Sequence, residues 1–229
     1  MIFMSLPGTE VAKFLGSIQP FKSLNASDLK AIVPKTTVKS FSKGETIFSE
    51  GEKANSVWVL YEGRVQILKY TSGGKPFAIE ALGPGELFGT LCRLGGNGRN
   101  YPCTAVAADL TTTLRILDRT FLEYYMKSPG MARGVCALCS DRLKDVQDLR
   151  CVAQESVMVR VVSILMRLHR VHGDLIPFTK KEISELAGTT LETTFRTLSD
   201  FQKRGYLTSL RGKIHIRKPT ALNSIVDQC

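Results

Sequence analysis

The chain has 229 residues, of which 43% are hydrophobic and 23% charged, and its formal net charge is +10. This length is enough for two ordinary domains that each bury a core. Half of the net charge lies in residues 178–218, where nine Lys and Arg stand against four Asp and Glu. Such a basic segment indicates a partner that carries phosphate, although it also serves solubility.

Several classes of protein are excluded by composition. No apolar run approaches the roughly 18 residues of a membrane span, and residues 1–4 are too short for a signal peptide, so we expect a cytoplasmic protein without a membrane partner. Every histidine lies at position 169 or later, which removes the metal ligands of a jelly-roll enzyme. The cysteines suit neither a disulfide framework nor a zinc motif, and most should be reduced and buried; they are Cys92, Cys103, Cys136, Cys139, Cys151 and Cys229. We expect no enzyme and no metal site.

The first 130 residues predict a β-sandwich domain. Residues 5–34 have apolar residues at helical spacing, with Asn25 or Ser27 able to cap a helix. From Thr36 to Leu117 the period changes to short alternating strands separated by glycine turns, which is typical of a jelly roll. Helix resumes at Asp118 and is broken at residues 128–130.

A long helix is predicted from residue 131 to about residue 152. Its residues at steps of three and four form a heptad seam: Ala132, Val135, Cys139, Arg142, Val146 and Leu149. One face of the helix should pack on its own sandwich, and we expect the other face to form a homodimer; the alternative is that the whole seam packs on the sandwich. Cys139 would face its own copy there, which leaves a disulfide between subunits and a buried inert thiol as alternatives. A further helix, residues 157–171, carries the core stripe Val161, Ile164, Leu165 and Leu168.

Residues 179–207 predict a helix-turn-helix. Thr179 and Glu182 have the spacing of a capping box, and Gly188 suits the end of the short helix that follows. Thr189 or Thr190 then caps a second helix. Leu198 and Phe201 should face inward with Thr194 and Leu191 on or near the same side.

The second helix has the residues of a DNA-reading helix. Glu192 and Arg196 lie near its start, where a carboxylate can accept from cytosine N4 and a guanidinium can donate to guanine O6 and N7. The alternative is an i, i+4 ion pair on a solvated helix. Residues 208–216 read as a basic hairpin, in which Arg211 and Lys213 would contact phosphate, and this wing favours the DNA hypothesis.

Four segments carry a resemblance to a known family: KGETIFSEGE at 43–52, VWVLYEGRVQI at 57–67, LGPGELFG at 82–89 and ISELAGTTLETTFRTL at 183–198. Over nearly its whole length the chain resembles the bacterial Crp/Fnr transcription regulators. The resemblance implies an α+β protein: a jelly-roll sensor domain like those that bind cyclic nucleotides (1–130), a dimerisation helix (131–152) and a winged helix-turn-helix (153–229). It also implies a homodimer, control by a signal that resets a hinge near residues 151–156, and RNA polymerase as a partner.

The resemblance also implies how DNA is read. Glu192 and Arg196 would read the G·A part of each half-site of an inverted repeat, either TTGA-like or TGTGA-like. Leu191 and Phe195 would tune the outer base, and as apolar residues they suit a thymine methyl group. The full predicted DNA-contact set is Thr179, Lys180, Lys181, Thr190, Leu191, Glu192, Thr193, Phe195, Arg196, Arg211 and Lys213.

The effector pocket implied by the resemblance lies between jelly roll and long helix, at Gly89, Thr90, Leu91, Arg99, Tyr101, Pro102, Cys103, Val146 and Gln147. Members that bind cyclic AMP have a Glu where this chain has Thr90, an Arg-Ser pair at the phosphate, and Thr-Ser where it has Val146 and Gln147. These departures leave a buried phosphate poorly paired, which argues against cyclic AMP. Because Arg99 could reach in from the adjacent loop, a cyclic nucleotide in a non-standard pocket remains the alternative.

Cofactors carried by other family members fit less well. An iron-sulfur cluster needs about four close thiolates, and only Cys136 and Cys139 are near neighbours. Haem lacks its usual histidine ligand, which leaves haem held by Cys, Met or another ligand, with carbon monoxide or nitric oxide as its signal. A small organic effector, a thiol switch at Cys92 or Cys103, and no effector at all stay open. The competing functions are a sensor module attached to a kinase or channel, and a cupin-like enzyme; we expect neither.

Overall fold

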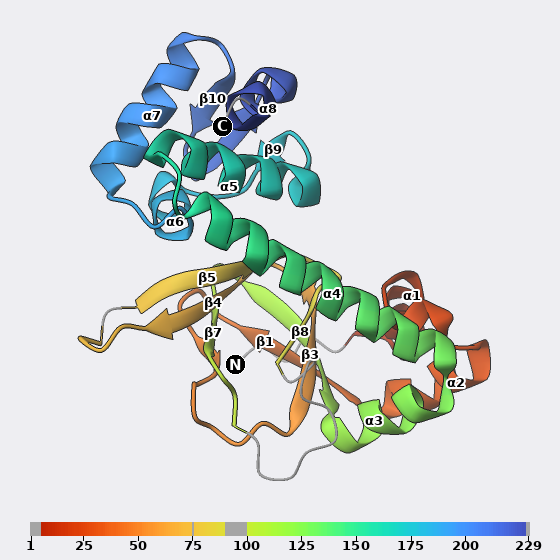
Figure 1. Ribbon diagram of the computed structural model, residues 1–229. Coiled ribbons are helices and arrows are strands. Elements are labelled where there is room, and N and C mark those ends of the chain that lie inside the picture. The colour runs from red at the N-terminus through yellow and green to blue at the C-terminus, as the bar shows by residue number, and fades with distance from the viewer. Residues whose placement is uncertain (1–5, 75, 90–99, 228–229) are drawn as a thin grey trace. The chain divides into compact units, whose positions relative to one another are not determined.

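The computed structural model describes residues 6–74, 76–89 and 100–227 (Figure 1). The chain divides into two compact units, Met1–Leu143 and Lys144–Cys229, and the division falls inside the long helix α4 (Pro129–Val152). The helix predicted for residues 131–152 is therefore present, but its residues are shared between the units rather than forming a segment of their own. None of the helices in the described ranges combines the length and hydropathy that a membrane-spanning helix requires.

Short helices open the first unit. They are α1 (Gly8–Ser17), the 3-10 turn Phe21–Ser23, α2 (Ala26–Ile32) and the 3-10 turn Val33–Lys35. The Asn25 side chain accepts a hydrogen bond of 2.8 Å from the Asp28 amide, so Asn25 is the cap of α2. This confirms the helical lead-in.

Two four-stranded antiparallel sheets make up the sandwich, in the orders β1-β8-β3-β6 and β2-β7-β4-β5. The pattern of short strands separated by glycine turns predicted these strands except β6, which follows the turn residues 83–86. Their bounds are β1 Thr36–Phe41, β2 Thr46–Phe48, β3 Ser56–Glu62, β4 Val65–Tyr70, β5 Pro76–Leu82, β6 Leu87–Gly89, β7 Thr104–Ala107 and β8 Thr111–Leu117.

Helices cover one face of the sandwich. Helix α3 (Asp118–Lys127) and the start of α4 pack on the lead-in through Phe121, Met131 and Val135. Gly130 makes this approach close, since a Cβ atom there would lie 2.9 Å from the Cβ of Ser23. The single residue Ser128 separates α3 from α4, so the predicted break at residues 128–130 is shorter than expected.

The predicted seam on α4 needs correction. Val135 is 4% exposed and Cys139 packs against the same core. Arg142 pairs with Glu80 at 3.2 Å and also donates to the Leu87 carbonyl. Three of the seam residues thus face their own sandwich, because a stripe with steps of three and four suits an intramolecular face as well as a dimer. Val146, another residue of the predicted seam, is 62% exposed, and Leu143, three residues before it, is 59% exposed. The Leu149 side chain lies outside the described residues.

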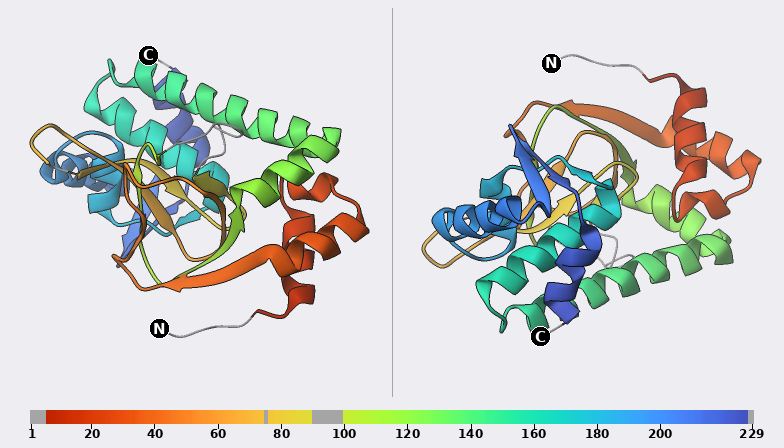
Figure 2. Two further views of the ribbon diagram at one scale, coloured as in Figure 1. Left: turned by 90° about the horizontal axis from the view of Figure 1, so that it is seen from below. Right: turned by 90° about the horizontal axis from the view of Figure 1, so that it is seen from above.

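The second unit is a helical domain with a small sheet. It contains α5 (Val157–His172), β9 (Leu175–Ile176), α6 (Lys180–Leu186), α7 (Leu191–Lys203), β10 (Leu207–Leu210), β11 (Lys213–Ile216) and α8 (Pro219–Asp227). The sheet has the order β10-β11-β9, and the pattern in the sequence did not predict its third strand, β9. Helix α8 packs against α5 (Figure 2).

The core of this unit follows the predicted stripe. Val161, Ile164, Leu165 and Leu168 of α5 are buried, and so are Leu198 and Phe201 of α7. The α5 helix begins after Ser156, whose hydroxyl accepts from the Val159 amide at 3.4 Å.

Candidate nucleic-acid interface

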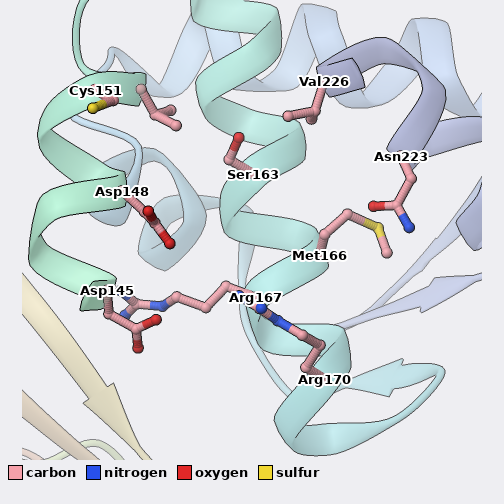
Figure 3. A pocket seen from close by; sticks show the side chains of 10 residues that line it. Asp145, Asp148, Cys151, Ser163, Met166, Arg167, Arg170, Asn223 and Val226 are labelled. Atoms are coloured by element: carbon pink, nitrogen blue, oxygen red, sulfur yellow. The ribbon is translucent and has the colours of Figure 1, made fainter. Parts of the chain in front are cut away.

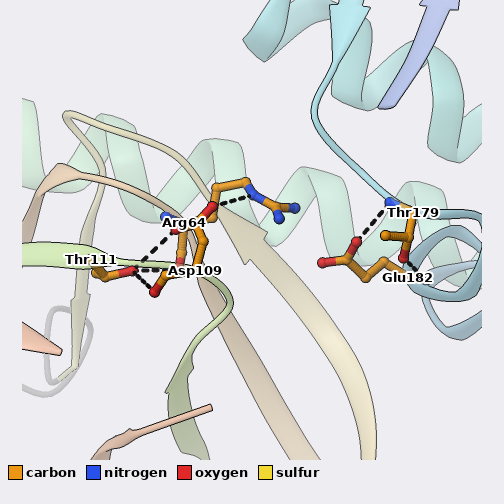
Figure 4. A network of polar contacts seen from close by, with 5 residues as sticks. All are labelled: Arg64, Asp109, Thr111, Thr179 and Glu182. Carbon is orange, nitrogen blue, oxygen red and sulfur yellow. Dashed lines mark hydrogen bonds and ion pairs between the residues drawn. The ribbon is translucent and has the colours of Figure 1, made fainter. Parts of the chain in front are cut away.

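A capping box fixes the start of α6. The Thr179 hydroxyl accepts from the Glu182 amide at 3.2 Å, and the Glu182 carboxylate accepts from the Thr179 amide at 2.7 Å (Figure 4). Both bonds satisfy amides that a helix start leaves unpaired, and they confirm the prediction. The first turn of α6 is therefore held in place, with Lys180 and Lys181 directly after the cap.

The turn between α6 and α7 is also fixed by its own residues. Gly188 has φ +59, a conformation that side chains other than glycine rarely adopt. Arg160 of α5 donates to the Gly188 carbonyl at 3.3 Å. Of the two threonines that were candidates for the next cap, Thr190 is the cap, since its hydroxyl accepts from the Thr193 amide at 3.2 Å. These bonds set the direction of α7.

Helix α7 presents a polar row to solvent. Glu192 and Arg196 are 82% and 79% exposed and form an ion pair of 2.8 Å. The i, i+4 ion pair that the alternative interpretation predicted is thus present. An exposed ion pair, however, adds little to stability. Its geometry holds a carboxylate and a guanidinium side by side near the start of the helix. There they can reach cytosine and guanine edges in a major groove.

An apolar row lies beside the polar one. Leu191 and Phe195, one turn apart, are 42% and 47% exposed. The prediction that Leu191 lies on or near the inward side is wrong: Leu191 is the first residue of α7, and burial on that side begins one turn later, at Thr194.

The wing and the start of α6 form a hollow with the apolar row. Strands β10 and β11 are connected by Arg211 and Gly212, and Gly212 has φ +73 as a tight hairpin requires. The hollow has a volume of about 300 Å³. It brings together six of the predicted DNA-contact residues and three that were not predicted: Thr179, Lys180, Lys181, Leu191, Phe195 and Lys213, with Phe178, Leu210 and Gly212.

The hollow does not include every predicted DNA-contact residue. Thr190 and Thr193 are engaged in the cap of α7, and Arg211 is at the exposed tip of the wing. Glu192 and Arg196 lie outside the hollow, on the polar row. Leu210, which is 55% exposed, was not predicted as a residue of this surface. Its position directly before the hairpin tip was a signal, because an apolar residue there has no core to pack against.

Tyr101, one residue of the predicted effector pocket, lies in an aromatic cluster of the sandwich. Tyr101 is 4% exposed and stacks on Phe48 with ring centroids 3.8 Å apart. Its hydroxyl donates to the Ser56 carbonyl at 3.3 Å and accepts from Trp58 Nε1 at 3.2 Å. Burial raises the pKa of Tyr101. Phe88 completes this cluster between the sheets, so Tyr101 is part of the sandwich core.

The other described residues of the predicted pocket belong to two different units. Gly89 ends β6 with φ +102, and a Cβ there would lie 3.0 Å from the Ser56 carbonyl oxygen. Pro102 and Cys103 are half-buried, and Val146 and Gln147 are exposed on the part of α4 that belongs to the second unit. Thr90, Leu91 and Arg99 lie outside the described residues, and so does Cys92.

Three cations of the first unit form ion pairs within that unit. Arg64 bonds Asp109 at 2.9 Å, and the Thr111 hydroxyl donates to the Arg64 carbonyl at 3.0 Å (Figure 4). Lys69 pairs with Glu50, and Arg142 with Glu80. Burial, together with the nearby Glu80 carboxylate, raises the pKa of the Cys103 thiol to about 11.

A second cavity, of about 490 Å³, lies between the end of α4, α5 and α8 of the second unit (Figure 3). Asp145 and Asp148 line it from α4 and Arg167 and Arg170 from α5, so its charge is balanced. No local pattern in the sequence predicts this cavity, because the cavity depends on the packing of helices that are far apart in the chain.

Comparisons with known proteins agree with this geometry. Residues 38–128 match the family model of the cyclic nucleotide-binding domain, and residues 159–225 match that of the Crp-like helix-turn-helix domain. The chain is 28% identical to the cyclic AMP receptor protein of Thermus thermophilus, over 81% of this chain and 86% of that one. It is 24% identical to the nitrogen fixation regulation protein FixK of Bradyrhizobium diazoefficiens, over 89% and 87%. The solved structure of FixK2 from Bradyrhizobium japonicum has the same fold, with a TM-score of 0.74, 24% identity, and coverage of 82% and 96%.

Proposed function

The chain belongs to the Crp/Fnr family of transcription regulators, and we propose that two copies of it read an inverted repeat in double-stranded DNA. Its parts are a sensor domain of the cyclic nucleotide-binding type and a Crp-like helix-turn-helix domain. The family consists of regulators rather than enzymes. The proposal extends to the DNA half-site that the chain reads, to its dimerisation and to the signal that controls it.

One observation carries the DNA-reading part. The side chains of Glu192 and Arg196 are about four-fifths exposed at the start of a capped helix, beside a wing that adds Lys213. A guanidinium bonds guanine bidentately and a carboxylate accepts from cytosine N4, so each half-site contains a G·C pair. A TTGA-like or TGTGA-like half-site satisfies this requirement.

Dimerisation rests on the exposed side of α4. Leu143 and Val146 lie three residues apart and are each about three-fifths exposed, which is unfavourable for large apolar side chains on a helix that stays alone. A second copy that packs on these residues would bury them. It would also supply a second recognition helix, as two half-sites one DNA turn apart require. RNA polymerase is the further partner that we propose, by analogy with the family.

We infer that the signal is not cyclic AMP. The tightly packed ring cluster of Phe48, Trp58, Phe88 and Tyr101 occupies the sandwich interior, and Lys69 and Arg142 are each engaged with a carboxylate. A bound cyclic phosphate would have to displace rings and break ion pairs, and a buried anion without a partner is costly. The Thermus thermophilus relative is named for cyclic AMP, and this chain would differ from it in that respect.

The remaining candidates are nitric oxide sensed through haem, thiol oxidation and a small organic molecule. The described part of the sandwich brings no histidine to a haem, because every histidine of the chain lies at position 169 or later. A haem would therefore take Cys or Met as its ligand.

Selection of bound duplexes from a random DNA pool tests the proposed function. The protein is used as purified and again with cyclic AMP, with haem plus nitric oxide, and with reductant. We expect an inverted repeat with a G·C pair in each half-site under at least one of these conditions. A folded protein that enriches no repeat under any of them would contradict the proposal.

A further inference from the structure

The cavity between α4, α5 and α8 is formed by matching faces of helices. Lining residues from α4 and from α5 recur every three or four positions: Asp145, Asp148 and Val152, and then Ser163, Arg167 and Arg170. Residues at this spacing lie on one side of a helix. The helices therefore turn one face each toward a common volume of about 490 Å³, which is the size of a site for a small molecule.

Charges of opposite sign line two walls of this cavity. Arg167 and Arg170 belong to α5, and Asp145 and Asp148 to α4 (Figure 3). In the ranges that the structure describes, none of these four side chains forms an ion pair. Asp145 and Arg167 are half-buried, and a charge partly removed from water is unfavourable without a partner. The walls therefore suit a ligand that carries both charges.

The rest of the lining offers a hydroxyl and apolar side chains. The Ser163 hydroxyl oxygen is buried and has no hydrogen-bond partner among the described residues, although buried polar atoms are normally satisfied. Val152, Met166 and Val226 line the same cavity and are half-buried. A ligand with a short apolar group would remove these three side chains from water.

We propose that this cavity binds a free α-amino acid with an apolar side chain. Arg167 and Arg170 would hold its carboxylate, since a guanidinium matches a carboxylate with two parallel hydrogen bonds. Asp145 and Asp148 would hold its ammonium group. A dicarboxylate would be repelled by the aspartates and a polyamine by the arginines, so neither fits both walls. The site goes beyond the proposed function, because it lies outside both the sandwich and the helix that reads DNA.

The dimer proposed above leaves this cavity accessible. With about 100° of rotation per residue, Val146 leaves α4 about 100° from Asp145, and Leu143 about 160° from it on the same side. A second copy that packs on Val146 and Leu143 therefore leaves the wall of Asp145 and Asp148 uncovered. A bound amino acid would contact both α4 and α5, which residues 153–156 connect, and would thereby restrain that turn.

Titration of the whole chain with L-leucine, followed by amide chemical shifts in NMR spectra, tests the proposal. L-leucinamide lacks the carboxylate and isocaproate lacks the ammonium, whereas both keep the apolar side chain. The pH is about 6.5, below the pKa of an α-amino group. We expect L-leucine to bind with a dissociation constant below about 1 mM and to shift amides of α5 and α8 most. Each analogue should bind at least about tenfold more weakly, because one charged wall stays without a partner.

Two variants assign the charges to their walls. Arg167→Gln should weaken L-leucine at least about tenfold and leave L-leucinamide nearly unchanged, because leucinamide has no carboxylate to lose. Asp145→Asn should weaken L-leucine similarly and leave isocaproate nearly unchanged. A residue that only supports the fold would weaken all three ligands alike. The control is Arg217→Gln, an exposed arginine of the same unit outside the cavity lining, which should bind L-leucine like the wild type.

Three results would overturn the proposal: no binding of L-leucine at about 10 mM, equal binding of the three ligands, or shift changes confined to the sandwich. A variant that weakens all ligands equally would contradict the role of its residue. These measurements need no DNA, so their failure and the failure of the proposed function are distinguishable.

Discussion

Two aromatic clusters of the protein differ in what surrounds them. In the sandwich, Tyr101 stacks on Phe48 and both of its hydroxyl bonds go to neighbours in the same unit. On α7, Phe195 has a lysine over its ring and is 47% exposed. The rings of the sandwich have their partners within the fold, whereas the ring on α7 lies open beside the residues that suit DNA.

This difference shows which of the two sites is ready for a ligand. A site whose rings and charges satisfy one another must be opened before a ligand enters, and that opening reduces affinity. A site with exposed side chains on capped helices binds without such rearrangement. We therefore expect the surface formed by α7 and the wing to bind DNA without rearrangement. The sandwich interior should resist a ligand of nucleotide size.

The largest effect should come from Phe48→Ala. Removal of this ring, which is 3% exposed, leaves a cavity between the sheets and should lower the free energy of unfolding by about 3–5 kcal/mol. Phe195→Ala should change it by no more than about 0.5 kcal/mol. Urea unfolding measures both, followed by Trp58 fluorescence for the sandwich and far-UV circular dichroism for the chain. Equal losses of unfolding free energy in the two variants would contradict the difference between the buried and the exposed ring.

Cys103, enclosed in the sandwich, should react more slowly with an alkylating reagent than exposed Cys136. At pH 8 the raised pKa of Cys103 leaves about 100-fold less thiolate than an ordinary thiol has, since the value is about 11 instead of 9.0. Its alkylation by iodoacetamide should therefore be slow at neutral pH and accelerate as the pH approaches 11. Exposed Cys136 is the internal control, and peptide mass spectrometry measures both. Similar rates at pH 8 would show that Cys103 is not enclosed.

On the DNA face, Arg196→Ala should remove discrimination at the G·C pair, at a cost of about 1–3 kcal/mol in specific binding. Lys180→Ala should instead weaken all sequences similarly and reduce the salt dependence by about one phosphate contact. Anisotropy titrations with matched and G·C-substituted duplexes distinguish the two results. Intact discrimination in Arg196→Ala would contradict the role assigned to the polar row.

The smallest effect should be that of Thr179→Ala. Loss of the capping box should destabilise α6 by about 1 kcal/mol, which amide hydrogen exchange of that helix can measure. Thr189→Ala is the matched control, because Thr190 rather than Thr189 caps α7. If both variants exchanged alike, the capping box would not hold the helix.

Local patterns in the sequence predicted most of the fold. Short strand patterns marked the strands of the sandwich other than β6, and caps at Thr179 and at Thr189 or Thr190 marked α6 and α7, since these signals act between residues close in sequence. Strand β9 was missed because Leu175 and Ile176 are too few to show a period. The seam on α4 was assigned to a partner because heptad spacing does not tell which surface a helix meets.

Long-range packing was beyond the sequence. The stacking of Phe48 on Tyr101 joins residues that are 53 positions apart, so no local pattern predicts that the two rings pack together. The sequence predicted only some of the residues that line the hollow. Phe178, Leu191 and Leu210 come from three segments that only the fold brings together. The polar row, by contrast, was predicted in full from its position on one helix.

The most direct test of the account is the affinity for the selected duplex, measured by anisotropy with and without millimolar cyclic AMP. A ligand changes DNA affinity only by its differential binding to the two states. Because the sandwich interior is filled, we predict a dissociation constant that cyclic AMP changes by less than about twofold. Tightening of about tenfold or more would show that the ring cluster opens for a nucleotide, and it would contradict the account.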